Sequence, residues 1–192
     1  MGRKGDVLYN PRRRERVVLE ETGAETGGMR LAMHVTQEPT AVRMPTHLHP
    51  YQRETFTIEA GALSYRLDGA SARIAGAGDT VIVEPGVRHE WWNDGPETVE
   101  MLGVMEPAGR WVDFMETIYG LTNEGKVNAR GIPNLFQIAV IAWEFRREWV
   151  PTALPTPLRL TFLPVLAAIG RLLGYRPTYP RYSEHGRAAA KV

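Results

Sequence analysis

Three histidines and one glutamate stand at spacings that would allow them to bind one metal ion. His47 and His49 are two residues apart, Glu54 follows five positions after His49, and His89 lies further along the chain. Residues i and i+2 of a β-strand point to the same face about 6.6 Å apart, so two imidazoles at this spacing can reach one ion. Nitrogen and oxygen ligands without sulfur suit Fe, Ni, Mn, Cu or Zn and do not select among them. The sequence therefore predicts one divalent transition metal with coordination positions left open for a substrate.

Glu54 can face the same side as the two histidines only if the chain between His49 and Glu54 interrupts the strand alternation of side chains. Strict alternation over five positions would put the carboxylate on the opposite face from His49. Residues 50–53 are therefore predicted to form a turn or bulge, helped by Pro50, which cannot donate to a β ladder. A carboxylate at the head of an apolar strand is costly to bury unless it is paired or bound to a cation. This cost is the physical reason to assign Glu54 as a ligand.

The residues that follow these candidates predict an apolar pocket beside the metal. If Glu54 points inward, alternation places Phe56 and Ile58 on the same face, and if His89 points inward, so does Trp91. Ordinary barrel core is the alternative interpretation for each of the three. A metal at one end of an apolar pocket is a usual form of small-molecule site. We therefore predict a substrate pocket lined by Phe56, Ile58 and Trp91.

Two regions of the chain differ in the spacing of their apolar residues. Residues 16–108 carry short alternating runs separated by Gly, Asp, Asn and Pro, which is typical of a β sandwich or barrel. From residue 109 onward the apolar spacing becomes helical, which predicts a helical extension and tail over 109–192, packed on the barrel or on a partner. Residues 1–15 are rich in arginine, and we expect a flexible basic arm rather than a phosphate-binding patch.

The helical region is predicted to hold three helices, at about 111–121, 131–149 and 156–173. Thr156 is expected to cap the third helix and Gly174 to follow its end. Pro164 should kink or split it. Arginines and this proline interrupt its apolar stretch, so we do not expect it to span a membrane.

The candidate metal ligands and the glycines around them resemble the two sequence motifs of the cupin superfamily. The first motif is matched, apart from its leading glycine, by His47, His49, Glu54 and Gly61. The second motif is matched by Gly78, Gly86, His89 and Asn93. At one position the chain has Glu84 where the motif has a proline, and the proline follows as Pro85. The resemblance covers about residues 40–105. It implies a mainly β fold, a double-stranded β-helix or jelly-roll barrel, in which His47, His49, Glu54 and His89 are the metal ligands. The C-terminal helices are similar to those of some bacterial single-domain cupins.

Composition excludes several classes of protein. The chain has 192 residues, 43% of them hydrophobic and 23% charged, as in ordinary globular proteins. It has no cysteine, so a disulfide scaffold, a thiolate metal site and a cysteine nucleophile are excluded. This fits a cytoplasmic protein, and no signal peptide is visible. A net charge of +1 gives no argument for a nucleic-acid partner. The surplus of large apolar residues in the helical part predicts a homodimer, which a monomer seen by light scattering would contradict.

The predicted metal site leaves three functions open. The first, which we favour, is an oxidoreductase of the dioxygenase type acting on a phenol, enol or diketone, with Glu54 as ligand and catalytic base, as the resemblance to cupin dioxygenases implies. The second is a non-redox cyclase, isomerase or lyase, in which a Zn-like ion polarises a carbonyl. The third is a module that binds a small molecule without turnover, since a fold alone does not decide function.

Overall fold

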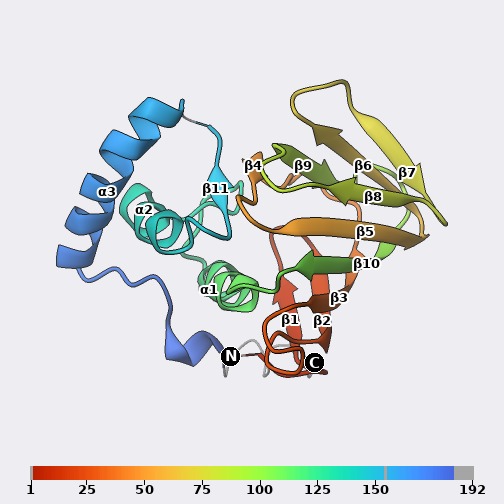
Figure 1. Cartoon of the computed structure of the whole chain (residues 1–192), viewed down its shortest axis with the longest axis horizontal. Helices are drawn as coiled ribbons and strands as arrows, with labels where there is room; N and C mark the ends of the chain where they lie inside the picture. The colour runs from red at the N-terminus through yellow and green to blue at the C-terminus, as the bar shows by residue number, and fades with distance from the viewer. Residues whose placement is uncertain (1, 154, 184–192) are drawn as a thin grey trace.

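A computed structural model describes residues 2–153 and 155–183, which form two antiparallel sheets curved into a barrel, with the helices on one side (Figure 1). The larger sheet has the strand order β1-β2-β3-β10-β5-β8, with bounds β1 (Val7–Asn10), β2 (Glu15–Glu21), β3 (Leu31–Gln37), β5 (Arg53–Ala60), β8 (Thr80–Val83) and β10 (Val99–Glu106). The smaller sheet has the order β11-β4-β9-β6-β7, with bounds β4 (His47–Leu48), β6 (Ala62–Leu67), β7 (Arg73–Gly76), β9 (His89–Trp92) and β11 (Val150–Pro151). The predicted jelly-roll barrel is confirmed.

The barrel core follows from the period-two alternation of its strands. On β10, Met101, Gly103 and Met105 are buried, while Leu102 and Val104, which alternate with them, are half-buried. Gly61 turns the chain from β5 into β6 with φ +73°, and an added Cβ there would lie 2.4 Å from the Thr98 carbonyl oxygen. The turn therefore needs glycine both for its backbone angle and for the close approach of the neighbouring strand.

The first residues of the chain differ from the expected flexible arm. Residues 7–10 form β1, which pairs with β2 in register from Val7 opposite Val18 to Asn10 opposite Glu15. The side chain of Arg13, expected in solvent, is buried beside Glu15. A strand pairing that the arginine-rich composition does not reveal orders this segment against the barrel.

The described part of the chain after the barrel includes the helices α1 (Trp111–Asn123), α2 (Leu135–Glu144) and α3 (Thr156–Leu172). Figure 1 shows α1 beside the strands, α2 next to it and α3 farthest from the barrel. The Asn134 side chain caps α2 by accepting hydrogen bonds from two backbone N–H groups of its first turn. Gly170 of α3 lets that helix approach α2 closely, because an added Cβ would lie 2.8 Å from the Phe136 carbonyl oxygen.

The third helix differs from its prediction in two details. Pro155 rather than Thr156 occupies the N-cap position, and Thr156 lies in the first turn. Pro164 stands inside a single continuous helix and does not split it. Gly174 follows the helix end with φ +88°, as predicted. Residues 184–192 of the expected tail lie outside the described part of the chain.

The helical region returns to the barrel through a short strand. β11 pairs with β4, with Val150 opposite Leu48 and Pro151 opposite His47. Pro151 is tolerated there because β11 is the edge of its sheet. The C-terminal part is thus joined to the strand that carries His47 and ends just before His49. Among residues 2–153 and 155–183, no helix combines the length and apolarity that crossing a bilayer requires.

Candidate metal centre

The four predicted ligands meet at one point inside the barrel. His47, His49, Glu54 and His89 each offer one ligand atom, and these four atoms lie within 4.8 Å of one another. Their relative exposures are between 1% and 4%, so the group is removed from solvent. Four such donors at this separation could hold one divalent ion.

Three strands bring these residues together. β4 and β9 pair so that His47 stands directly opposite His89. Glu54 is the second residue of β5, and its Cα partner on the neighbouring strand is Met105 of β10. β4 ends at Leu48 and β5 begins at Arg53, so the predicted break between His49 and Glu54 is confirmed.

Hydrogen bonds fix this break in the strand. Within it, Gln52 donates from Nε2 to the carbonyls of Pro107 and Ala108, at 3.0 and 3.1 Å. The His49 carbonyl accepts a 2.8 Å hydrogen bond from the N–H of Gly86. The turn that places Glu54 beside the histidines is therefore held by the chain on both sides.

Backbone carbonyls orient all three imidazoles. His47 Nδ1 lies 2.8 Å from the Pro45 carbonyl oxygen, and His89 Nδ1 lies 3.1 Å from that of Val87. His49 Nδ1 lies 2.5 Å from the Glu148 carbonyl oxygen, which comes from the segment between α2 and β11. A carbonyl can only accept, so each Nδ1 carries the proton, and the Nε2 lone pair of a neutral ring is left to point at the common centre. This is the tautomer that a metal-binding histidine requires.

Unpartnered buried atoms at the centre fit a bound cation. Glu54 Oε2 lies 3.0 Å from His89 Nε2 and 3.4 Å from His49 Nε2, yet none of these three buried atoms has a hydrogen bond. Leaving polar atoms buried and unpaired costs free energy. A shared divalent ion would satisfy all of them, so the residues present fit a metal.

The charges of the group are strongly coupled. Burial alone raises the pKa of Glu54, but the His49 and His89 imidazoles outweigh it and bring that pKa below its ordinary value. Burial, together with the neighbouring His89 and His49, lowers the pKa of His47 well below its usual range. Burial also opposes protonation of His89, yet the Glu54 carboxylate raises the pKa of His89 above the ordinary value. These shifts favour an ionised Glu54 and a neutral His47, and they favour protonation of His89.

These pKa shifts predict that metal binding releases a proton and weakens in acid. A ligand imidazole must be neutral, so as the pH falls through the raised pKa of His89 an incoming ion must displace that proton. We expect metal affinity to fall by about tenfold per pH unit in that range. Calorimetric titration with Zn²⁺ in buffers of different ionisation enthalpy would count the protons released. An affinity independent of pH between about pH 5 and pH 8 would contradict the expectation.

A cavity of about 540 Å³ opens on the metal group. His47 and Glu54 form part of its wall, and so do Phe56 and Trp91, whose rings lie 5.7 Å apart. Ile58, also predicted to line the pocket, is 1% exposed in the barrel core and is not part of the cavity wall. It stands two residues further along β5 than Phe56, which puts it beyond the cavity.

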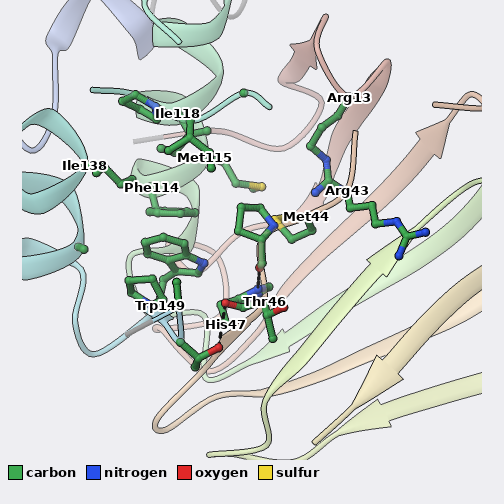
Figure 2. Close-up of a pocket in the computed structure, with 18 of the residues that line it drawn as sticks. Arg13, Arg43, Met44, Thr46, His47, Phe114, Met115, Ile118, Ile138 and Trp149 are labelled. Atoms are coloured by element: carbon green, nitrogen blue, oxygen red, sulfur yellow. Dashed lines mark hydrogen bonds between the residues drawn. The ribbon is translucent and has the colours of Figure 1, made fainter. Parts of the chain in front are cut away.

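The helical region supplies the opposite wall, which the sequence did not reveal. The ring of Trp111 on α1 lies 4.8 Å from His49, and the ring of Trp149 lies 6.2 Å from His47. Phe114 stacks on Trp111 at 4.9 Å. Figure 2 shows His47 next to Trp149, with Phe114, Met115 and Ile118 further along the same pocket. Helical spacing predicts that these residues share an apolar face, but not which part of the barrel that face covers.

A buried polar group also lines the cavity and was missed. Arg13 and Glu15 both belong to the cavity wall and are 5% and 2% exposed. For Glu15 the signal was present, because alternation extended backward from Val17 and Leu19, both buried, places it on the inner face. Arg13 lies in the turn before β2, where alternation does not apply. The neighbouring arginines hid this pattern by suggesting a solvated segment.

Comparison with known proteins gives both a domain family and distant relatives. The cupin domain family matches residues 33–105. A probable oxidoreductase of Hypocrea virens is 25% identical over 72% of this chain and 67% of its own length. A probable oxidoreductase of Aspergillus clavatus is 28% identical over 72% of this chain and 46% of its own, and an oxidoreductase of Arthrobotrys oligospora is 26% identical over 79% and 64%. The chain thus spans less than two thirds of the last two proteins.

Two solved structures overlap with part of the chain. A conserved double-stranded β-helix protein from Klebsiella pneumoniae is 20% identical, with a TM-score of 0.42, over 57% of this chain and 84% of that one. A cupin from Methanocaldococcus jannaschii with the same type of fold is 19% identical, with a TM-score of 0.39, over 44% and 76%.

Proposed function

We propose that this chain, which belongs to the cupin superfamily through residues 33–105, is a metal-dependent oxygenase acting on a small phenolic, enol or diketone substrate. The observation that carries the proposal is the buried His-His-Glu-His group at the wall of an apolar cavity. Three neutral imidazoles and one carboxylate leave a divalent ion with net positive charge and with open positions. That combination suits a substrate that binds through a deprotonated oxygen.

The cavity supports a substrate of this class. Its wall around the metal group is aromatic, with Phe56 and Trp91 from the barrel and Trp111 and Trp149 from the helical region. Such a wall excludes water and packs against a flat, apolar ring. A volume of about 540 Å³ lies in the range of small-molecule sites.

Glu54 is proposed to receive the proton of the substrate. Its pKa lies below the ordinary value, so the carboxylate is ionised at neutral pH. Oε2 could accept a proton from a hydroxyl or enol placed beside it if a bound divalent ion made that group more acidic. A bound divalent ion would supply the remaining chemistry, by stabilising the substrate oxyanion and serving the redox step with O₂. In a dioxygenase-type reaction both atoms of O₂ enter the product, so no external reductant is required. The distant relatives named as oxidoreductases support redox chemistry.

Oxygen consumption tests the proposal. The protein is reconstituted separately with Fe, Ni, Mn, Cu or Zn and supplied with a panel of catechols, enols and β-diketones. The expected result is O₂ uptake in a one-to-one ratio with substrate loss for at least one redox-active metal, with ¹⁸O from ¹⁸O₂ found in the product.

Two outcomes would replace the proposal with another function. A product isomeric with its substrate, formed without O₂ uptake, would instead indicate a cyclase or isomerase. Tight binding of panel members with no product under any metal would indicate a binding module.

A further inference from the structure

A second polar group lies in the cavity wall, separate from the metal ligands. Arg13 donates from Nε and Nη2 to Glu15 Oε2, at 3.0 and 2.6 Å. Tyr119 of α1 donates its hydroxyl to the other oxygen of Glu15. All three side chains are buried and all three line the cavity. The remaining donor atom of the guanidinium, Arg13 Nη1, is buried and has no partner.

The position of Arg13 is fixed before any ligand arrives. Its backbone N–H donates to Asn10 Oδ1 at 3.1 Å, and its carbonyl accepts from Gln37 Nε2 at 3.4 Å. The guanidinium carbon lies 4.3 Å from the centre of the Trp91 ring. Figure 2 shows Arg13 directed toward Met44 and the other drawn side chains, whereas Arg43 points away from them. A charged donor held in place by the backbone and by an aromatic face is preorganised for binding.

Arg13 stacks on a residue that stands one two-residue strand step beyond the metal group. Trp91, on which it stacks, is two residues after the ligand His89 on β9, and Phe56 is two residues after Glu54 on β5. Such a step is roughly 6.6 Å along a strand. Figure 2 shows His47 and Arg13 well apart among the residues that line the same pocket. A molecule about the length of a substituted benzene ring could therefore contact both.

The charges of this group select the kind of atom that Arg13 would bind. The positive charge of Arg13 is already balanced by Glu15, which accepts two of its hydrogen bonds. Burial and the adjacent Glu15 raise the pKa of Tyr119 well above its usual range, so its hydroxyl stays protonated and remains a donor to Glu15. The pair is neutral overall, and a carboxylate from a ligand would add an unbalanced negative charge beside Glu15. A neutral acceptor would complete the hydrogen bonds of Nη1 without that cost.

Resting on the proposed function, we propose that Arg13 determines specificity by donating a hydrogen bond from Nη1 to a neutral carbonyl or hydroxyl oxygen of the substrate. The substrate would then carry two oxygen functions on opposite sides of an apolar ring. One would bind at the metal group and the other at Arg13. An aryl ketone with a phenol or catechol at its far end has this pattern.

A pair of matched catechols tests the inference. 4-Acetylcatechol and 4-ethylcatechol have the same size and the same metal-binding end, but only the first has a carbonyl oxygen. Their Kd values are measured by calorimetry on protein loaded with zinc, which is redox-inert, under argon. We expect the preference of the unaltered protein for the acetyl compound to fall about tenfold in Arg13→Lys. Lysine keeps a cation beside Glu15, but its single nitrogen cannot replace both Nη2, which binds Glu15, and Nη1, which would bind the substrate.

Controls separate this inference from the proposed function. Arg16→Lys makes the same change at an exposed position of β2, three residues further along the chain, and should leave the preference unaltered. The Kd for 4-ethylcatechol reports the metal end, and it should stay within about twofold in both variants. An unchanged preference in Arg13→Lys, with both catechols still bound, would overturn the role of Arg13 alone. Failure of both catechols to bind the unaltered zinc protein would overturn the proposed function and this inference with it.

A measurement on the unaltered protein avoids any effect of substitution on folding. With ¹⁵N-labelled arginine, the guanidinium resonances of Arg13 should shift on adding 4-acetylcatechol and change much less on adding 4-ethylcatechol. Equal shifts with both compounds would contradict a hydrogen bond to the carbonyl oxygen.

Discussion

Replacing His49 with alanine is expected to strip most of the metal from the protein. His49 offers its Nε2 to the common centre while the Glu148 carbonyl fixes its ring, so the variant loses a ligand that is already oriented. Loss of an outer partner of a metal ligand typically weakens binding 10–100-fold, and loss of the ligand itself should cost at least about 100-fold. Metal content after purification without added metal should fall accordingly, as measured by elemental analysis.

His34→Ala is the matched control for this experiment. His34 lies on β3 outside the metal group and is paired with Glu59 at 3.1 Å. Its removal should leave the metal content unchanged. If His49→Ala retained the metal content of the unaltered protein, the assignment of the site would be wrong.

Glu54→Gln is expected to lower turnover by about 10²–10⁴-fold even when metal is saturating. The amide has nearly the same shape as the carboxylate, so the local packing is kept. It has no negative charge, however, and cannot accept the substrate proton. Metal affinity should also fall, because one anionic ligand is replaced by a neutral one. Measuring kcat across a metal titration separates the two effects, since added metal restores occupancy but not the base.

Glu59→Gln provides the comparison on the same strand. Glu59 is exposed near the end of β5, and its substitution should change neither metal affinity nor turnover. If Glu54→Gln recovered full turnover at saturating metal, the carboxylate would have no role as a base and would serve only as a ligand.

The sequence predicted that His47, His49, Glu54 and His89 come together, because the strands of a barrel convert residue spacing into side-chain direction. Alternation along β4, β5 and β9 determines which side chains face inward, and the break between His49 and Glu54 followed from parity alone. Phe56 and Trp91, which the same rule turned inward, lie in the wall of the cavity. Parity specifies the face of a strand but not the depth at which a cavity ends, and for that reason Ile58 lies in the core instead.

Contacts between distant segments could not be predicted in this way. The Glu148 carbonyl orients His49 through the backbone, which is present at every residue and leaves no trace in the side-chain pattern. β11 is only two residues long and includes a proline, so its existence depends on pairing with β4 rather than on local preference. Arg13 was hidden for a different reason, since its burial depends on Glu15 and on the ring of Trp91.

Part of the cavity wall comes from stretches of the chain outside the one that holds the four candidate metal ligands. The four ligands lie between positions 47 and 89, inside the family match, whereas Arg13, Glu15, Trp111 and Trp149 lie outside it. A library that randomises the flanking wall residues would therefore change which molecules fit the cavity and leave the four candidate metal ligands intact. For the same reason, a substrate should not be assigned from residues 33–105 alone. That segment contains the candidate metal ligands that proteins with this domain have in common, but not the part of the cavity wall that lies outside it.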